Sequence, residues 1–288
     1  MKEMNRLFVR NNIVLAIVLF ITVILSYRTS YAEKIFWMEQ LNMHEIDINV
    51  KLVQEIIQGY DGFTYAFNFF FSGNYYSIYA FILTAGATII SGITAANDRY
   101  TGRGNLIIVR IGTRKYVNKL LIKQAEYAFA ISITMCFIVI FVSLCLFSVS
   151  AGGSYVYFGT NVSPAILVML LLGHSALLGV YLCEVLWIET LLSCFISNPY
   201  IMASIPLFLF YGLNFVLPVI SKIKFDSVIA FLELLRPEVF LLSVYTSTVT
   251  DGTVLTRLMH FMTLPIIYMG AILLLRGEYI RRMCSAYC

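Results

Sequence analysis

The sequence predicts an all-α integral membrane protein that forms a single transmembrane domain, 1–288, with six membrane-spanning helices. Apolar residues make up 60% of the chain and charged residues only 12%, whereas soluble domains carry about 25% charged residues. The mean hydropathy of +0.83 agrees with this composition. The apolar residues also gather into runs of roughly the 20 residues that a helix needs to cross a bilayer.

Six apolar runs, separated by polar or charged segments, are the predicted spans. They cover 11–27, 75–96, 127–149, 164–187, 200–220 and 263–275, the last being short unless it begins near Leu258. The first run follows basic residues, as the apolar part of a signal peptide does, but it lacks a clear small-residue cleavage pattern. We therefore interpret it as an uncleaved first span.

The distribution of Lys and Arg predicts the orientation, because cytoplasmic loops close to span ends carry an excess of both residues. A cytoplasmic amino terminus places 13 of the 20 Lys and Arg residues inside: three before the first span, seven in 97–124 and three after the last span. The reverse orientation would put the densest basic cluster outside. We expect a multi-pass protein in the lipid bilayer of the plasma membrane, with both termini cytoplasmic.

A long external insert is predicted between the first two spans, at about 28–74. It holds six acidic and three basic residues, and its net charge is therefore −3. Between Ile46 and Ile57, apolar residues recur at spacings of three and four, which is typical of an amphipathic helix on an apolar surface. We expect an external helical cap here.

Aromatic residues follow, in the stretch "GFTYAFNFFFSGNYYSIY". Aromatic rings are common where a span enters the membrane interface, and a strip that contacts a transported substrate is the second interpretation. The candidate substrate path contains Phe69, Phe70, Tyr75, Tyr76, Tyr79 and His174. His174 lies among small residues of a predicted helix-packing face, so we favour a hydrogen-bonded structural histidine over a proton relay.

The segment 97–124 is very basic and lies between the second and third predicted spans. Its Lys and Arg residues could set topology, bind anionic lipid headgroups or dock on a cytoplasmic partner. Five apolar residues favour docking, because a loop that only sets topology needs no apolar core: Leu106, Ile107, Ile108, Val109 and Ile111. The pattern "NLIIVRIG" predicts a short helix that ends at Gly112.

This segment resembles the cytoplasmic loop of the membrane permeases of type-two ABC exporters. In that family an acidic residue, an arginine and a glycine precede a short apolar helix, and basic residues follow it. The matching positions are Asp98, Arg99 and Gly102, then Asn105 to Ile111, then Arg114, Lys115 and Lys119. In layout the resemblance covers the whole chain, with six spans, cytoplasmic termini, an amphipathic amino-terminal helix and a long break before span six. In residues it covers only this loop.

The resemblance implies that the short helix is a coupling helix that docks on a separate cytoplasmic ATPase. The implied contact residues are Arg99, Arg103, Asn105, Leu106, Ile107, Ile108, Val109, Arg110, Ile111 and Arg114. ATP and Mg would bind to that partner and no cofactor to this chain. A second permease subunit, identical or homologous, would complete the path. The expected cargo is an amphipathic peptide, a lipid or an antibiotic-like molecule moved out of the cell.

The segment before the last span, at about 221–260, contains short apolar stretches interrupted by charges. Neither half is long enough to cross a hydrocarbon core of about 30 Å. We therefore expect a re-entrant or interfacial helical pair, with turns near Pro237 and Gly252. The resemblance implies the same arrangement.

Three glutamates lie in or beside predicted spans, where a buried charge costs about 3 kcal/mol or more. We expect Glu126 to begin span three and to pair locally with Lys123. Glu184 and Glu189 either mark the cytoplasmic end of span four or meet basic residues of the coupling segment or of a partner.

Enzyme motifs are missing from the sequence. It has no HExxH, no GxSxG, no pair of intramembrane aspartates, no phosphate-binding P-loop and no metal-ligand spacing of Cys and His. We therefore expect no catalytic residue, no metal and no nucleic-acid partner, and any ATP hydrolysis would occur on another chain. The alternative function is a membrane sensor, or an accessory or immunity subunit, without transport activity. A secondary transporter is third, since ion coupling usually leaves charged residues near the bilayer midplane.

Overall fold

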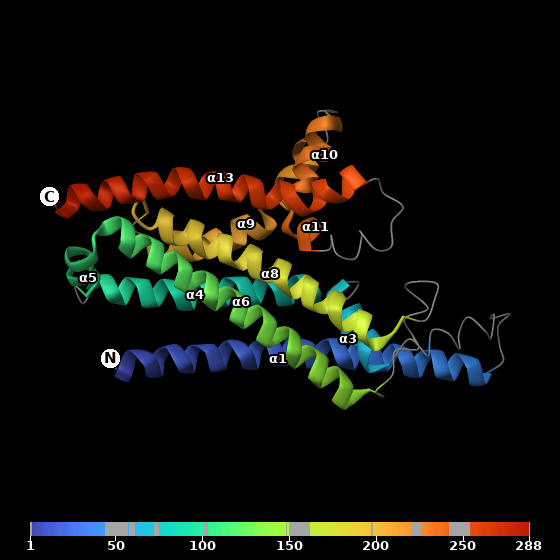
Figure 1. Ribbon diagram of the computed structural model, residues 1–288. Coiled ribbons are helices and arrows are strands. Elements are labelled where there is room, and N and C mark those ends of the chain that lie inside the picture. Colours follow the sequence, from blue (N-terminus) through green and yellow to red (C-terminus); the bar gives the residue numbers. More distant parts are fainter. Residues whose placement is uncertain are drawn as a thin grey trace.

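The computed structural model describes residues 2–43, 57, 61–71, 75–100, 103–147, 149, 162–196, 198–220, 226–241 and 254–287. These residues are helical apart from turns and helix ends, and no strand occurs among them. The long helices lie side by side in an elongated bundle (Figure 1). The helices are α1 (Lys2–Met43), α3 (Gly62–Phe71), α4 (Tyr76–Tyr100), α5 (Arg103–Ile111), α6 (Thr113–Leu146), α8 (Pro164–Leu192), α9 (Pro199–Ile220), α10 (Asp226–Leu234), α11 (Pro237–Leu241) and α13 (Val254–Tyr287).

Four helices of the described chain are long and apolar enough to cross a membrane, as expected of a membrane protein. Their apolar segments are Val9–Glu39 in α1, Thr113–Leu146 in α6, Pro164–Leu192 in α8 and Leu258–Cys284 in α13. Two further helices, α4 and α9, carry the shorter apolar stretches Tyr76–Ser91 and Ser204–Val219. These six helices coincide with the six predicted spans, but a count of six crossings stays a prediction.

The first predicted span, 11–27, lies inside a longer helix, and the external position of 28–43 stays a prediction. Helix α1 continues without interruption from Lys2 to Met43, so no separate amphipathic helix precedes the span. No Gly or Pro occurs in this stretch, and the polar residues after Tyr27 are compatible with helix. The run that predicted the first span therefore ends before the helix does.

Helix α3, at the end of the predicted external insert, is a buried part of the bundle, and its position relative to the membrane stays a prediction. This helix packs against α6 and α8, and eight of its ten residues are buried. The carboxylate of Asp61 caps its start by accepting a hydrogen bond of 2.8 Å from the backbone N–H of Thr64. The predicted amphipathic helix at 46–57 lies outside the described residues, apart from Ile57.

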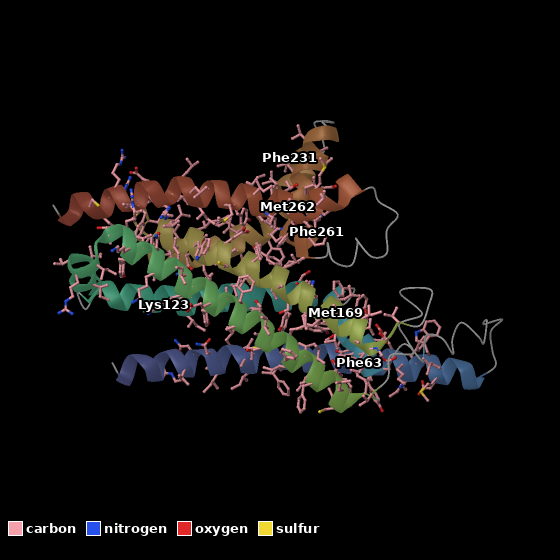
Figure 2. The ribbon with its side chains drawn as sticks, viewed as in Figure 1. Phe63, Lys123, Met169, Phe231, Phe261 and Met262 are labelled. Carbon is pink, nitrogen blue, oxygen red and sulfur yellow. The ribbon has the colours of Figure 1, made fainter. Side chains whose placement is uncertain are left out.

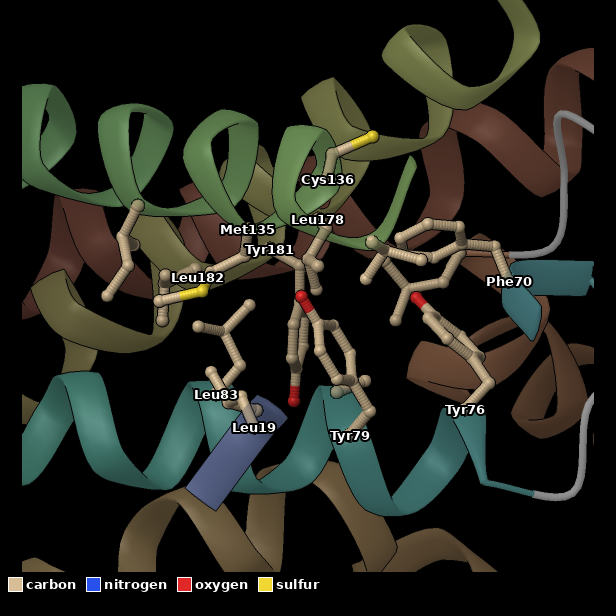
Figure 3. Close-up of a cluster of buried hydrophobic side chains, with 14 of the residues drawn as sticks. Leu19, Phe70, Tyr76, Tyr79, Leu83, Met135, Cys136, Leu178, Tyr181 and Leu182 are labelled. Atoms are coloured by element: carbon tan, nitrogen blue, oxygen red, sulfur yellow. The ribbon is translucent and has the colours of Figure 1, made fainter. Parts of the chain in front are cut away.

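The core of the bundle lies between α4, α6 and α8, and α8 packs most extensively against α6. Helix α8 is apolar on nearly all sides, which is typical of a central helix. Gly179 allows the close approach of α6, because a Cβ atom at this position would lie 2.8 Å from Cδ1 of Phe129. Figure 3 shows how Tyr79 of α4 and Tyr181 of α8 interdigitate in this core.

The helix that contains the third predicted span begins well before residue 127. Helix α6 starts at Thr113, so Glu126 lies well inside the helix and is exposed. The described structure contains no ion pair between Glu126 and Lys123, so the predicted local pair is not formed. The basic residues after Gly112 therefore belong to the same helix as the apolar span.

Two short helices, α10 and α11, occupy the predicted break before the last span. Leu235 and Arg236 separate them, and Arg236 Nη2 lies 2.7 Å from Oε2 of Glu238 in an ion pair. Helix α10 runs across the direction of the long helices (Figure 1). The interrupted helical pair thus agrees with the sequence, while its depth in a membrane stays a prediction. The second expected turn, at Gly252, lies outside the described residues.

Candidate functional site

Helix α5 is the nine-residue helix that the sequence predicts within the basic segment. It lies at one end of the bundle between α4 and α6, and both ends of the chain lie at the same end (Figure 1). It begins two residues before the predicted start at Asn105 and includes Gly104. Its last turn is closed by the N–H of Gly112, which donates to the carbonyl oxygen of Ile108 at 2.8 Å.

Gly112 forms the corner between α5 and α6. Its φ of 81° lies in the left-handed region, which a side chain with a Cβ atom adopts only at a cost of about 1–2 kcal/mol. The carbonyl oxygen of Gly112 then accepts a hydrogen bond of 3.0 Å from the N–H of Tyr116, in the first turn of α6. The prediction that a glycine ends the short helix is therefore confirmed.

The apolar side chains of α5 divide between two faces. Ile108 is only 6% exposed and packs against the rest of the chain, whereas Val109 is 81% exposed. Arg110 and Ile111 are also exposed, and Ile107 is half-buried. The exposed part of α5 that a partner could contact therefore includes Val109, Arg110 and Ile111, and Ile108 holds the helix to its own chain.

The remaining predicted docking residues are described only in part. Arg114 is exposed in the first turn of α6. The side chains of the other four lie outside the described part of the structure: Arg99, Arg103, Asn105 and Leu106.

Five of the six candidate substrate-path residues meet in one aromatic cluster. Phe69 and Phe70 of α3 make edge contacts with Tyr79 of α4, with ring centroids 5.3 and 6.0 Å apart. Phe70 also lies 5.9 Å from Tyr76 and 5.3 Å from His174 of α8. The structure thus brings three helices together at these residues, which the sequence could only group by composition.

The sixth residue, Tyr75, lies at the edge of this cluster. It is half-buried, and its hydroxyl lies 3.1 Å from Oγ1 of Thr29 in α1. The phenol ring therefore links the start of α4 to α1.

The aromatic cluster is packed as a core, with exposures of 1% for Phe69, Phe70 and Tyr79. His174 is fully buried, and its Nε2 atom lies 2.7 Å from the hydroxyl of Tyr76. The prediction of a hydrogen-bonded structural histidine agrees with this geometry. A substrate that used this route would have to separate α3 from α4 and α8.

Two open recesses lie on other surfaces of the described structure. One, of about 560 Å³, is apolar and lies between α10 and α13, where Phe231 and Met262 line it (Figure 2). The other, of about 400 Å³, lies along α6 and is lined by Lys115, Asn118, Lys119, Ile122, Lys123 and Glu126. Neither recess is lined by residues of the aromatic cluster.

The side chain of Gln124 forms polar contacts inside the helix bundle that the sequence did not predict. The amide Nε2 of Gln124 in α6 donates to Oγ1 of Thr190 in α8 at 2.5 Å and to Oγ of Ser91 in α4 at 3.1 Å. Gln124 lies on the buried face of α6, at a position that the helical period of Val117 and Leu121 could have indicated.

Glu184 and Glu189 lie in the same α8 helix and are buried, with exposures of 3% and 6%. They form no ion pair with any described Lys or Arg. The expectation that they meet basic residues of the coupling segment is therefore not met within the described part of this chain. Their burial is more complete than expected of residues that only mark the end of a span.

Among the described residues, no group of three or more His, Cys, Asp or Glu side chains could hold a metal ion. Comparisons with protein-family models, with curated proteins and with solved structures find no match to this chain.

Proposed function

We propose that this chain is the permease subunit of an ABC exporter, and that α5 couples it to a separate ATPase. The observation that carries the proposal is α5 itself. A short helix with exposed apolar and basic side chains projects from the end of the bundle where both termini lie (Figure 1). Such a helix has the form of a transmission element, since a single-residue corner at Gly112 joins it directly to α6.

The anchor of the docking surface is Val109, and the exposed Arg110 and Ile111 follow it in the last turn of the helix. An apolar side chain that is 81% exposed outside the apolar spans is costly to hydrate, and burial against a partner would remove that cost. Arginine beside it supports orientation and specificity more than affinity. Ile108 is excluded from this surface because its own chain already covers it.

The transport path would be completed by a second permease subunit. Within this subunit the aromatic cluster of α3, α4 and α8 is closed, so opening requires α3 to move relative to α8. An amphipathic peptide, lipid or antibiotic-like cargo suits a path lined by aromatic rings, which offer apolar faces with polar hydroxyl tips.

Copurification from the native membrane tests the proposal. The full-length chain is expected to recover, in near-equal amounts, a protein with a complete P-loop that hydrolyses ATP. Val109→Asp should reduce this recovery about tenfold or more, because it places a charge at the centre of a docking surface. Val149→Asp is the matched control: Val149 is 74% exposed and lies beyond the other end of α6.

The outcomes separate the candidate functions. Loss of the ATPase and of transport with Val109→Asp, and retention of both with Val149→Asp, supports the coupling role. Recovery of the wild-type chain without any P-loop protein contradicts the proposal and favours the sensor or accessory function. Equal losses with both variants would indicate general damage and would also contradict a specific role for α5.

A further inference from the structure

The outward face of α6 carries a row of lysines that the coupling proposal does not use. Lys115, Lys119 and Lys123 follow one another at steps of four, and all three are exposed. Residues at this spacing lie on one side of a helix. The opposite side of the same turns is buried, at Val117 and Leu121. The lysines therefore face away from the bundle, and Figure 2 shows where Lys123 lies on α6.

The same face becomes apolar farther along α6. Ile133, Phe137 and Phe141 are 38%, 52% and 69% exposed. Each lies 18 residues, or five helical turns, after one of the three lysines, so they lie on the same side of α6. Lys123 and Ile133 are ten residues apart, which corresponds to about 15 Å along a helix. This is half of a hydrocarbon core of about 30 Å. One helix face thus presents cations at one level and apolar side chains about one leaflet deeper.

The lysines line a defined recess of about 400 Å³, together with Asn118, Ile122 and Glu126. A fourth cation is held at its border, because Arg276 of α13 donates from Nη2 to Oδ1 of Asn118 at 2.7 Å. None of the three lysines forms an ion pair with a carboxylate in the described structure. The recess therefore has an excess of positive charge, with one glutamate against three lysines and the neighbouring arginine.

We infer that this face of α6 binds an anionic phospholipid. The phosphate lies among Lys115, Lys119 and Lys123, and an acyl chain follows Ile133 and Phe137 toward the bilayer centre. Lysine is a common point-charge ligand for phosphate, and clusters of Lys and Arg close to a span attract anionic lipids. The apolar continuation of the row distinguishes a lipid from a soluble phosphate, which would gain nothing from it.

Native mass spectrometry of the full chain in detergent tests the inference with defined lipids. Phosphatidylglycerol and phosphatidylcholine with identical acyl chains are titrated separately, and the dissociation constant of the first bound lipid is measured. We expect wild-type protein to bind phosphatidylglycerol about tenfold more tightly. Lys119→Gln/Lys123→Gln should abolish this preference, since two of the three phosphate-facing charges are lost.

A matched control removes two positive charges elsewhere. Arg28→Gln/Lys34→Gln lies in the second half of α1, and it should keep the tenfold preference. Thermal unfolding of both double variants in detergent is expected to match that of the wild type, because all four side chains lie on the surface or are only half-buried.

Four outcomes would overturn the inference. They are equal binding of the two lipids by the wild type, an unchanged preference in Lys119→Gln/Lys123→Gln, an equal loss in the α1 control, and displacement of phosphatidylglycerol by millimolar inorganic phosphate. The last would assign the lysines to a soluble anion. The result does not depend on the coupling role of α5, because no ATPase is present in the measurement.

Discussion

Nε2 of His174 lies 2.7 Å from the hydroxyl of Tyr76, which is a direct hydrogen bond between α8 and α4 across 98 residues of sequence. Both side chains are buried, and the rings of Phe70 and Phe71 surround the imidazole at 5.3 and 4.8 Å. A buried hydrogen bond in apolar surroundings specifies one arrangement of helices, because a slip would leave both polar groups without partners. This pair therefore sets the register of α4 against α8.

Tyr76→Phe should lower the free energy of unfolding by about 1–3 kcal/mol. The substitution keeps the ring but leaves Nε2 of His174 buried without its partner. The measurement is chemical or thermal unfolding of the purified protein in detergent, followed by Tyr and Trp fluorescence.

Tyr79→Phe is the control for this prediction. Tyr79 is also buried in the same helix, but its hydroxyl has no hydrogen-bond partner among the described residues. Its removal should be neutral or slightly stabilising, because no bond is lost and a buried polar atom disappears. Equal destabilisation by the two substitutions would show that the hydrogen bond to His174 does not account for the lost free energy of unfolding.

Gly179→Ala should loosen the contact between α6 and α8. The new Cβ atom would lie 2.8 Å from Cδ1 and 3.1 Å from Cε1 of Phe129, so the ring must leave its position. Overpacking of this kind costs about 1–3 kcal/mol, which offsets the gain of about 1 kcal/mol for Ala over Gly in a helix. We expect a lower unfolding temperature.

Gly173→Ala provides the comparison, because it lies in the same helix and nothing is within 4 Å of a Cβ atom there. This variant should have an unchanged or higher unfolding temperature. If Gly179→Ala were also stabilising, close packing of α6 on α8 would not be the reason for the glycine.

Gly112→Ala should destabilise the corner between α5 and α6 by about 1–2 kcal/mol, because Ala is strained at a φ of 81°. The effect is local, so limited trypsin digestion is the best measurement. Cleavage after Arg110 and Arg114 should become faster than in the wild type. Gly277→Ala, within α13 and with free space for a Cβ atom, should leave the digestion pattern unchanged.

The sequence predicted the long helices well because each is a sustained apolar run, and it predicted α5 because Gly112 follows a short apolar stretch. The prediction from apolar runs was less accurate where a helix continues through polar residues or where burial depends on tertiary contacts. Helix α1 extends to Met43 through polar residues that are compatible with helix. Helix α3 is as aromatic as a membrane interface, and only its tertiary contacts with α6 and α8 show that it is buried.

The position of the candidate site in the chain was predictable, but which side chains of α5 are buried and which are exposed was not. Composition groups Ile108 and Val109 together, although one is buried and the other is 81% exposed. In a helix of nine residues the apolar period is too short to tell which side meets the bundle. The hydrogen bonds of Gln124 were missed for a related reason, since a single amide in an apolar run gives no indication of its partners.

Ile108→Asp should therefore destabilise the fold, whereas Val109→Asp should not. Ile108 is 6% exposed, and a buried unpaired carboxylate would detach α5 from the bundle, so we expect loss of at least about 2 kcal/mol of stability and rapid trypsin cleavage at Arg110. Val109 is 81% exposed, and the same change there should leave unfolding and digestion within error of the wild type. Similar destabilisation by both would contradict the placement of α5. If only Ile108→Asp is destabilised, loss of a partner in Val109→Asp would reflect damage to the docking surface. The same loss in Ile108→Asp would reflect detachment of α5 from the bundle.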